Sequence, residues 1–198
     1  MECRAAVLAV AAVVAAHRDE LVELDRVIGD GDHGENLRRG FAAAVSTVDG
    51  SGPVLRQVAT LLISKVGGAA GPLYGTGFLR AAGAVEGRPL DGFVVASALA
   101  AALEGVVALG KAAVGDKTMV DALAPAVAAA ESAAASGGSV AAVLEAAAVA
   151  AAEGAASTVP LVARKGRAAY LGARSAGHLD PGARSTALVL RAFADAAR

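Results

Sequence analysis

Three aspartates lie close together in the segment LDRVIGDGDHGENLRRGF, which begins at Leu24. Asp25, Asp30 and Asp32 fall within eight residues, and carboxylates so close repel one another unless a cation lies between them. Oxygen ligands with no cysteine and one histidine nearby favour Mg²⁺, with Ca²⁺ as the second choice. The spacing is not that of an EF-hand, because no Glu stands at its twelfth position. We predict metal ligation here, with a solvated acidic turn as the alternative.

The acidic segment runs directly into a predicted helix, opened by Gly34, Glu35 and Asn36. Free N–H groups and the positive dipole end of a helix N-terminus attract phosphate oxygens. Magnesium beside such a terminus is what a nucleoside diphosphate or triphosphate requires. His33 stands between the two and is placed to hydrogen-bond a phosphate, although an isolated histidine is more often structural.

Two later segments suit the same ligand but have structural alternatives. VGGAAGP at 66–72 offers small residues and backbone donors before a helix, and tight helix packing explains it equally well. In GKAAVGDKTM at 110–119, Thr118 and Asp121 resemble a helix-capping pair as much as a phosphate contact. Met119 is either an apolar cover for an adenine ring or a core residue.

A fourth segment, LGARSAGHLDPGA at 171–183, follows a basic cluster of Arg164, Lys165 and Arg167. Cations near a phosphate site suit phosphoryl transfer, and on a helix they are equally a solvated face. We assign no role to His178, and we interpret His17 as a helix-surface residue.

The elements that must position these segments are helical. Alanine, the best helix former, dominates a composition that is 56% hydrophobic. Val and Ile lie in Ala-rich stretches rather than in alternating runs, so no strand is predicted. We predict an all-α fold with eight helices, and we expect Pro160 to kink the seventh. The helices are expected near 4–24, 35–48, 53–66, 72–85, 90–109, 119–136, 139–170 and 183–197.

The connections between these helices strictly alternate between two kinds. Those near 49–53, 86–90 and 136–139 are short and plain, whereas the other four are the segments described above. In an up-and-down antiparallel bundle every second loop lies at the same end. We therefore expect one site, built from four loops at one end of a single domain spanning 1–198.

Composition excludes several function classes. A net charge of -1 and 3% aromatic residues without Trp do not fit a nucleic-acid partner. The single cysteine, Cys3, is compatible with a cytoplasmic protein. Every apolar stretch is interrupted by Glu, Asp or Gly before it reaches about eighteen residues, the length of a membrane-spanning helix. No membrane insertion is therefore expected. Residues 1–16 could pass for a signal peptide, but we favour the first helix of the fold because the pattern continues into HRDELVELD.

Four blocks taken together resemble the L subunit, or L domain, of dihydroxyacetone kinases. They are LDRVIGDGDHGENLRRGF, VGGAAGPLYGTGFLRAA, VGDKTMVDALAPA and KGRAAYLGARSAGHLDPGA, and in this order they span nearly the whole chain. The resemblance implies an eight-helix antiparallel barrel that binds Mg²⁺, expected as two ions, with ADP or ATP at one end. It implies magnesium on Asp25, Asp30 and Asp32.

The same resemblance implies the remaining site residues. Arg167 would lie near the transferred phosphoryl group as the catalytic residue, and Asp180, Pro181 and Gly182 would close over the nucleotide. The full set of implied nucleotide contacts is His33, Gly34, Glu35, Asn36, Ala69, Ala70, Gly110, Met119, Arg167, Asp180, Pro181 and Gly182. This chain departs from the family at Ala70 and Ala169, where Ser is common, and at Glu35, which adds a negative charge close to the phosphates.

In this family the ketose binds to a separate K subunit or domain, which these 198 residues do not contain. The expected function is therefore the Mg-nucleotide-binding, phosphoryl-transferring subunit of a dihydroxyacetone kinase, incomplete without its K partner. The donor is ATP, or a phosphohistidine carrier of the phosphotransferase system that acts through bound ADP. A homodimer is a further possible assembly of this chain. The alternatives are a non-catalytic Mg-nucleotide-sensing module and a kinase domain of the related fatty-acid-kinase type.

Overall fold

The computed structural model describes residues 3–48 and 52–198, and within these ranges the chain is all-α, as predicted. The described residues form nine α-helices and one 3-10 helix and no strand. Residues 49–51 of the plain connection at 49–53 lie outside the described residues. The elements are α1 (Cys3–Ala16), α2 (Arg18–Ile28), α3 (His33–Thr47), α4 (Val54–Lys65), α5 (Ala70–Val85), α6 (Gly92–Gly110), α7 (Val120–Ala135), α8 (Val140–Ser157), η1 (Arg167–Ser175) and α9 (Pro181–Ala196).

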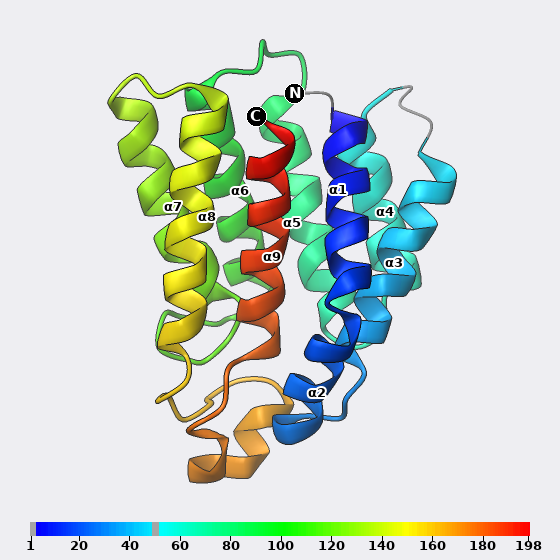
Figure 1. Ribbon diagram of the computed structural model, residues 1–198, viewed down its shortest axis with the longest axis vertical. Helices are drawn as coiled ribbons and strands as arrows, with labels where there is room; N and C mark the ends of the chain where they lie inside the picture. The colour runs from blue at the N-terminus through cyan, green and yellow to red at the C-terminus, as the bar shows by residue number, and fades with distance from the viewer. Residues whose placement is uncertain (1–2, 49–51) are drawn as a thin grey trace.

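The long helices stand side by side along the long axis of the molecule (Figure 1). From α3 to α9 each helix packs on the next one in the chain, and α1 packs on both α3 and α9. The described ends of the chain lie at one end of this bundle, and α2 and η1 lie at the other (Figure 1). The bundle therefore has two distinct ends.

Small residues allow the helices to approach closely. The core is mostly Ala, Val and Leu, with Phe41 and Phe78 in an edge-to-face contact at 6.0 Å between ring centroids. At Gly71 in the first turn of α5, a Cβ atom would lie 2.3 Å from the carbonyl oxygen of Val66. Only glycine allows this approach, which holds the second predicted loop tightly between α4 and α5.

Two apolar helices bear on the expectation of no membrane insertion. By length and composition alone, α6 and α8 are apolar enough to cross a membrane, although α6 contains Glu104 and α8 contains Glu145 and Glu153. Each packs between two neighbours, α6 between α5 and α7, and α8 between α7 and α9. Because that is the place of a core helix in a bundle, we interpret both as core helices.

The prediction of eight helices was wrong at the first of them. The segment expected as one helix near 4–24 is two helices that meet at His17, whose ring bonds the carbonyl oxygen of Val13 at 2.9 Å. The second of these, α2, continues to Ile28 and buries Leu21, Asp25 and Ile28. The break lets α2 turn toward the end of the bundle where η1 lies (Figure 1).

The prediction of one kinked helix over 139–170 was also wrong. The helix α8 ends at Ser157, before Pro160, and η1 begins only at Arg167. The hydroxyls of Ser157 and Thr158 bond carbonyls of the last turn, and Pro160 has no N–H with which to continue the helix. Arg164 and Lys165 therefore lie on an irregular segment, not on a helix.

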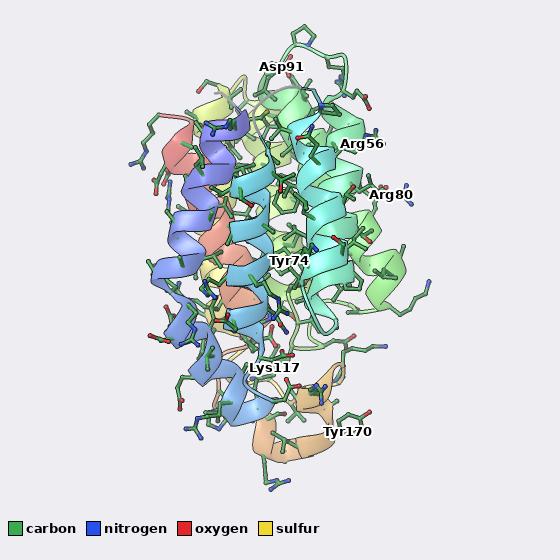
Figure 2. All side chains as sticks on the ribbon, turned by 90° about the vertical axis from the view of Figure 1, so that its right-hand side faces the viewer. Arg56, Tyr74, Arg80, Asp91, Lys117 and Tyr170 are labelled. Carbon is green, nitrogen blue, oxygen red and sulfur yellow. The ribbon has the colours of Figure 1, made fainter. Side chains whose placement is uncertain are left out.

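The predicted alternation of loops is confirmed in the described residues. At one end, a Cβ at Gly92 would lie 2.3 Å from the carbonyl oxygen of Gly138, so two of the plain connections touch. Figure 2 shows Asp91 at this end and Lys117 and Tyr170 toward the other. The four unusual loops meet at that second end.

Candidate functional site

A cavity of about 310 Å³ lies at the end formed by the four unusual loops, and all four line it. Twelve of the fifteen predicted site residues are among its lining residues: Asp25, Asp30, Asp32, His33, Ala69, Ala70, Gly110, Met119, Arg167, Asp180, Pro181 and Gly182. The structure therefore brings predicted residues from α2, α3, α5, α6, η1 and α9, and from the loops beside them, to one place.

The three aspartates form one cluster. One oxygen atom from each of Asp25, Asp30 and Asp32 lies within 4.8 Å of the others. Asp25 is buried, and its Oδ2 accepts hydrogen bonds from the backbone N–H groups of Asp32 at 2.9 Å and His33 at 3.2 Å. The bonds fold the loop around this carboxylate.

The cluster fits a divalent cation. Desolvation raises the pKa of Asp25, the charges of Asp30 and Asp32 raise it further, and the two backbone N–H groups oppose the change. The remaining oxygen of Asp25, Oδ1, occupies the space beside Gly29, where a Cβ would lie only 2.1 Å from it. Three hard oxygen donors that repel one another, one of them seated in a space kept by glycine, are the donor set that Mg²⁺ prefers.

Arg167 is the one predicted cation that reaches the acidic cluster. Its Nε lies 2.9 Å from Oδ2 of Asp30, although about two thirds of the Arg167 side chain is exposed. An exposed pair of this kind contributes little to stability. Its consequence is spatial, since it places a guanidinium from η1 at the edge of the carboxylates.

His33 does not offer a free ring nitrogen. Its Nε2 lies 2.8 Å from Oγ of Ser185, and the ring also bonds the backbone of Pro181. Desolvation lowers the pKa of His33 to about 4. The imidazole is therefore neutral at pH 7 and is engaged by protein groups, which favours the structural interpretation of this side chain.

Gly34, Glu35 and Asn36 are not among the lining residues of the cavity. Glu35 is paired with Arg38 at 2.6 Å and with Arg18 at 3.1 Å, and these pairs lower the pKa of Glu35 to about 2. Its charge is thus balanced outside the cavity, which removes the physical basis for expecting it to repel a phosphate.

Asn36 contributes to the site by packing. It is buried, and its Oδ1 accepts a hydrogen bond from Arg39 at 2.6 Å. A Cβ at Gly67 would lie 3.1 Å from the same oxygen. The first loop and the second are therefore in direct contact.

The second and third loops supply backbone donors and an apolar floor. Ala69 and Ala70 stand at the first turn of α5, where N–H groups have no partner within the helix. The apolar lining residues next to them are Leu73, Tyr74, Val106, Ala112, Met119 and Val120. Ala70 provides no hydroxyl, so any contact with a ligand at this position is made by its backbone.

The capping interpretation of Thr118 and Asp121 is confirmed. The carboxylate of Asp121 accepts from the backbone N–H of Thr118 at 2.7 Å and of Gly115 at 2.5 Å, while the Thr118 hydroxyl accepts from Val120 N–H at 3.1 Å. These bonds close the third loop onto the start of α7.

Lys117 is a buried residue of the cavity wall to which the sequence patterns gave no role. It is 1% exposed, has a left-handed backbone with φ of 62°, and lines the cavity. Its Nζ donates to the carbonyl oxygens of Thr158 at 2.7 Å, of Val159 at 3.4 Å and of His178. Burial lowers the pKa of Lys117. One ammonium group therefore joins the third loop to the end of α8 and to the fourth loop.

Asp180 caps α9 beside this lysine. Its Oδ2 accepts from the N–H of Ala183 at 2.7 Å, and its own N–H donates to the Thr158 hydroxyl at 3.0 Å. Burial raises the pKa of Asp180 to about 7, with Lys117 acting in the opposite direction. These hydrogen bonds therefore hold the segment 180–182 in place at the start of α9. Pro181 and Gly182 also line the cavity.

Comparison with known proteins points to one family. A family model described as the DAK2 domain matches residues 27–195. The chain is 41% identical over 192 residues to the ADP-binding subunit of the PEP-dependent dihydroxyacetone kinase of Escherichia coli K12, covering 94% of this chain and 91% of that subunit. It is 39% identical over 172 residues to the ADP-binding subunit of the PTS-dependent dihydroxyacetone kinase of Lactococcus lactis, covering 84% and 82%.

A solved structure shares the fold. The dihydroxyacetone kinase of C. freundii in complex with AMP-PNP and Mg²⁺ matches with a TM-score of 0.72 at 28% identity, over 97% of this chain and 33% of that one. The likeness therefore covers one third of a longer kinase.

The contacts of Lys117 lead to a stability prediction. Lys117→Met should lower the free energy of unfolding by about 2–4 kcal/mol, because it leaves three carbonyl groups without their donor. Chemical denaturation measures this change. Lys111→Met is the matched control, since Lys111 is exposed and also has a left-handed backbone, with φ of 51°. Equal effects of the two substitutions would contradict the role given to the Lys117 ammonium.

Proposed function

This chain belongs to the DAK2-domain family, and on that premise we propose that it is the ADP-binding, phosphoryl-transferring subunit of a dihydroxyacetone kinase. The observation that carries the proposal is the cavity, in which three carboxylates lie beside the first turns of α3 and α5 above an apolar floor. The relatives named above are dihydroxyacetone kinases or their subunits. This favours a kinase subunit over a nucleotide-sensing module or a fatty-acid-kinase domain.

We propose that Asp25, Asp30 and Asp32 hold magnesium, as two ions. A magnesium ion bound with nucleotide phosphates typically takes only one or two protein carboxylates. Three carboxylates in one cluster therefore suit two ions. The presence of Mg²⁺ together with AMP-PNP in the C. freundii kinase supports this arrangement.

Each wall of the cavity has a separate task. A donor would first phosphorylate bound ADP to ATP, whose γ-phosphoryl group would pass to the ketose and leave ADP in the site, while Mg²⁺ would supply the positive charge that offsets the phosphate oxygens. Ala69 and Ala70 donate backbone N–H groups to phosphate oxygens, and Met119 covers the adenine ring. Arg167 stabilises charge that develops on the transferred group, because it already reaches the carboxylate cluster. Catalysis by this chain is then positioning and charge neutralisation, with no protein nucleophile.

The partners and the architecture follow from the same premise. The two named relatives that this chain matches over most of their length are PEP- or PTS-dependent subunits. This supports a phosphohistidine carrier as donor, acting through retained ADP, and a separate K subunit that presents dihydroxyacetone. We also propose that α1 and α3 to α9 close into one eight-helix antiparallel barrel, forming a single cytoplasmic domain. The packing of α1 on both α3 and α9 supports this closure.

Asp32 offers the cleanest test of the magnesium site. Its side chain has no hydrogen-bond or ion-pair partner among the described residues, and it lines the cavity. Asp32→Asn should weaken Mg-dependent ADP binding by about tenfold or more, because it removes one ligand charge. Isothermal calorimetry with and without Mg²⁺ measures this effect.

Asp91→Asn is the control for that experiment. It makes the same charge change at the opposite end of the bundle (Figure 2), where an asparagine still caps α6. It should leave ADP binding unchanged. If Asp32→Asn binds Mg-ADP as tightly as the unaltered protein, the assignment of the aspartate cluster is wrong.

Arg167 is expected to act on transfer rather than on binding. Arg167→Ala should lower the rate of phosphoryl transfer to dihydroxyacetone by about 100-fold or more. The dissociation constant of Mg-ADP should change much less. The rate is measured in a mixture with a K subunit and the phosphoryl donor. Arg174→Ala, on the same 3-10 helix, is the control. Equal losses of binding and transfer in Arg167→Ala would indicate a structural arginine instead.

A further inference from the structure

A hydrogen-bond network lies directly beneath the cavity. The hydroxyl of Ser185 in α9 lies 2.8 Å from Nε2 of His33 at the start of α3 and 2.7 Å from the hydroxyl of Tyr74 in α5. The Tyr74 hydroxyl also lies 3.0 Å from that of Thr186. The hydroxyls of Ser185 and Thr186 reach the Gly182 carbonyl at 3.1 Å and 2.8 Å. The network therefore joins three of the helices that carry the site.

Ser185 is the centre of this network. It is 0% exposed and does not line the cavity, yet it contacts three residues that do, namely His33, Tyr74 and Gly182. Tyr74 is buried, and Figure 2 shows it between the end where Asp91 lies and the end where Lys117 lies. A single hydroxyl group thus contacts both the first turn of α3 and the first turn of α9.

The hydrogen bonds of the network can be assigned one direction of donation, from Tyr74 through Ser185 to His33. The His33 ring bonds the backbone of Pro181, whose only hydrogen-bonding group is a carbonyl, so the ring nitrogen facing it carries the hydrogen. We assign this hydrogen to Nδ1, which leaves Nε2 as an acceptor for the Ser185 hydroxyl. The single hydrogen of Ser185 then goes to His33 and not to the Gly182 carbonyl, which accepts from Thr186, and the Tyr74 hydroxyl donates to Ser185. Every polar atom of the chain Tyr74–Ser185–His33–Pro181 is satisfied.

We propose that Ser185 is a positioning residue for the nucleotide site, with Tyr74 orienting its hydroxyl toward His33. The proposal rests on the proposed function. His33 follows the metal ligand Asp32 and its N–H bonds Asp25, while Pro181 and Gly182 form the opposite wall. Tying the His33 ring to both Ser185 and Pro181 therefore fixes the acidic loop against the start of α9, and groups that act through such ties are needed to hold ligands in place.

The first experiment compares ADP affinity with stability. Ser185→Ala should raise the dissociation constant of Mg-ADP by about tenfold, measured by calorimetry at saturating Mg²⁺. Ala192→Gly is the matched control, because Ala192 is 1% exposed on the same helix and far along it from the network. It should lower the melting temperature while leaving ADP affinity within about twofold, as expected for the loss of helix propensity and of one buried methyl group away from the network.

A double-variant cycle tests the order of the chain. Tyr74→Phe keeps the ring in the core and should weaken Mg-ADP binding less than Ser185→Ala does. If Tyr74 acts through Ser185, the double variant should bind Mg-ADP as Ser185→Ala alone does. Independent, additive losses would overturn the relay. Tyr74→Phe also keeps the test available should Ser185→Ala fail to fold.

Nitrogen NMR of the His33 ring reports which ring nitrogen carries the hydrogen. A general loss of packing would not change this tautomer in a specific direction. The unaltered protein should show a hydrogen on Nδ1 only, and Ser185→Ala should show a mixture of the two tautomers. His17→Gln and His178→Gln variants assign the signal. A hydrogen on Nε2 in the unaltered protein would overturn the assignment.

The outcomes separate the two proposals. If the unaltered protein does not bind Mg-ADP, the proposed function fails. If it binds Mg-ADP and Ser185→Ala binds equally well, or loses affinity only as far as Ala192→Gly does, the positioning role of Ser185 fails while the proposed function stands.

Discussion

The site depends on one buried carboxylate. Asp25 is held by the backbone N–H groups of Asp32 and His33, and its second oxygen fills the space that Gly29 leaves open. These contacts bend the chain back on itself between α2 and α3, so that Asp30 and Asp32 are brought to the same point and α3 starts beside them. The negative charge gathered in this way requires a cation, and the helix start favours phosphate oxygens.

The opposite wall of the cavity depends on a buried cation. Lys117 joins the third loop to the end of α8 and to the fourth loop, and Asp180 caps α9 next to it. The Ser185 network lies between this wall and the acidic loop and connects them through His33. The loops of the site are thus held by three sets of buried polar contacts, around Asp25, around Lys117 and around Ser185. The Ala-rich helices pack around them.

The sequence predicted the residues that line the cavity better than it predicted the buried contacts that hold those residues in place. The aspartate spacing and the alternation of loops can both be recognised along the sequence. In an antiparallel bundle every second loop lies at the same end, so the alternation of loops predicts which of them meet. The Ser185–His33 and Lys117–His178 contacts join residues 152 and 61 positions apart, so no local pattern announces them. The pairing of Glu35 with Arg18 was missed for the same reason.

The errors in helix boundaries have a different cause. At Pro160 the hydrophobic pattern continues past a residue that has no N–H with which to continue the helix. At His17 the backbone hydrogen bonds to and from its neighbours continue, and the ring bonds the Val13 carbonyl as well. Both breaks turn the chain toward the site, which is why they fall next to α2 and to the segment that leads into η1.

The most direct test is to identify the small molecule that acid denaturation releases from the purified and extensively dialysed protein. The proposed subunit holds ADP through magnesium, so chromatography should show about one ADP per chain, and less after dialysis against a chelator. If no adenine nucleotide is released, and none binds when Mg²⁺ is supplied, the cavity is not a nucleotide site and the account is wrong.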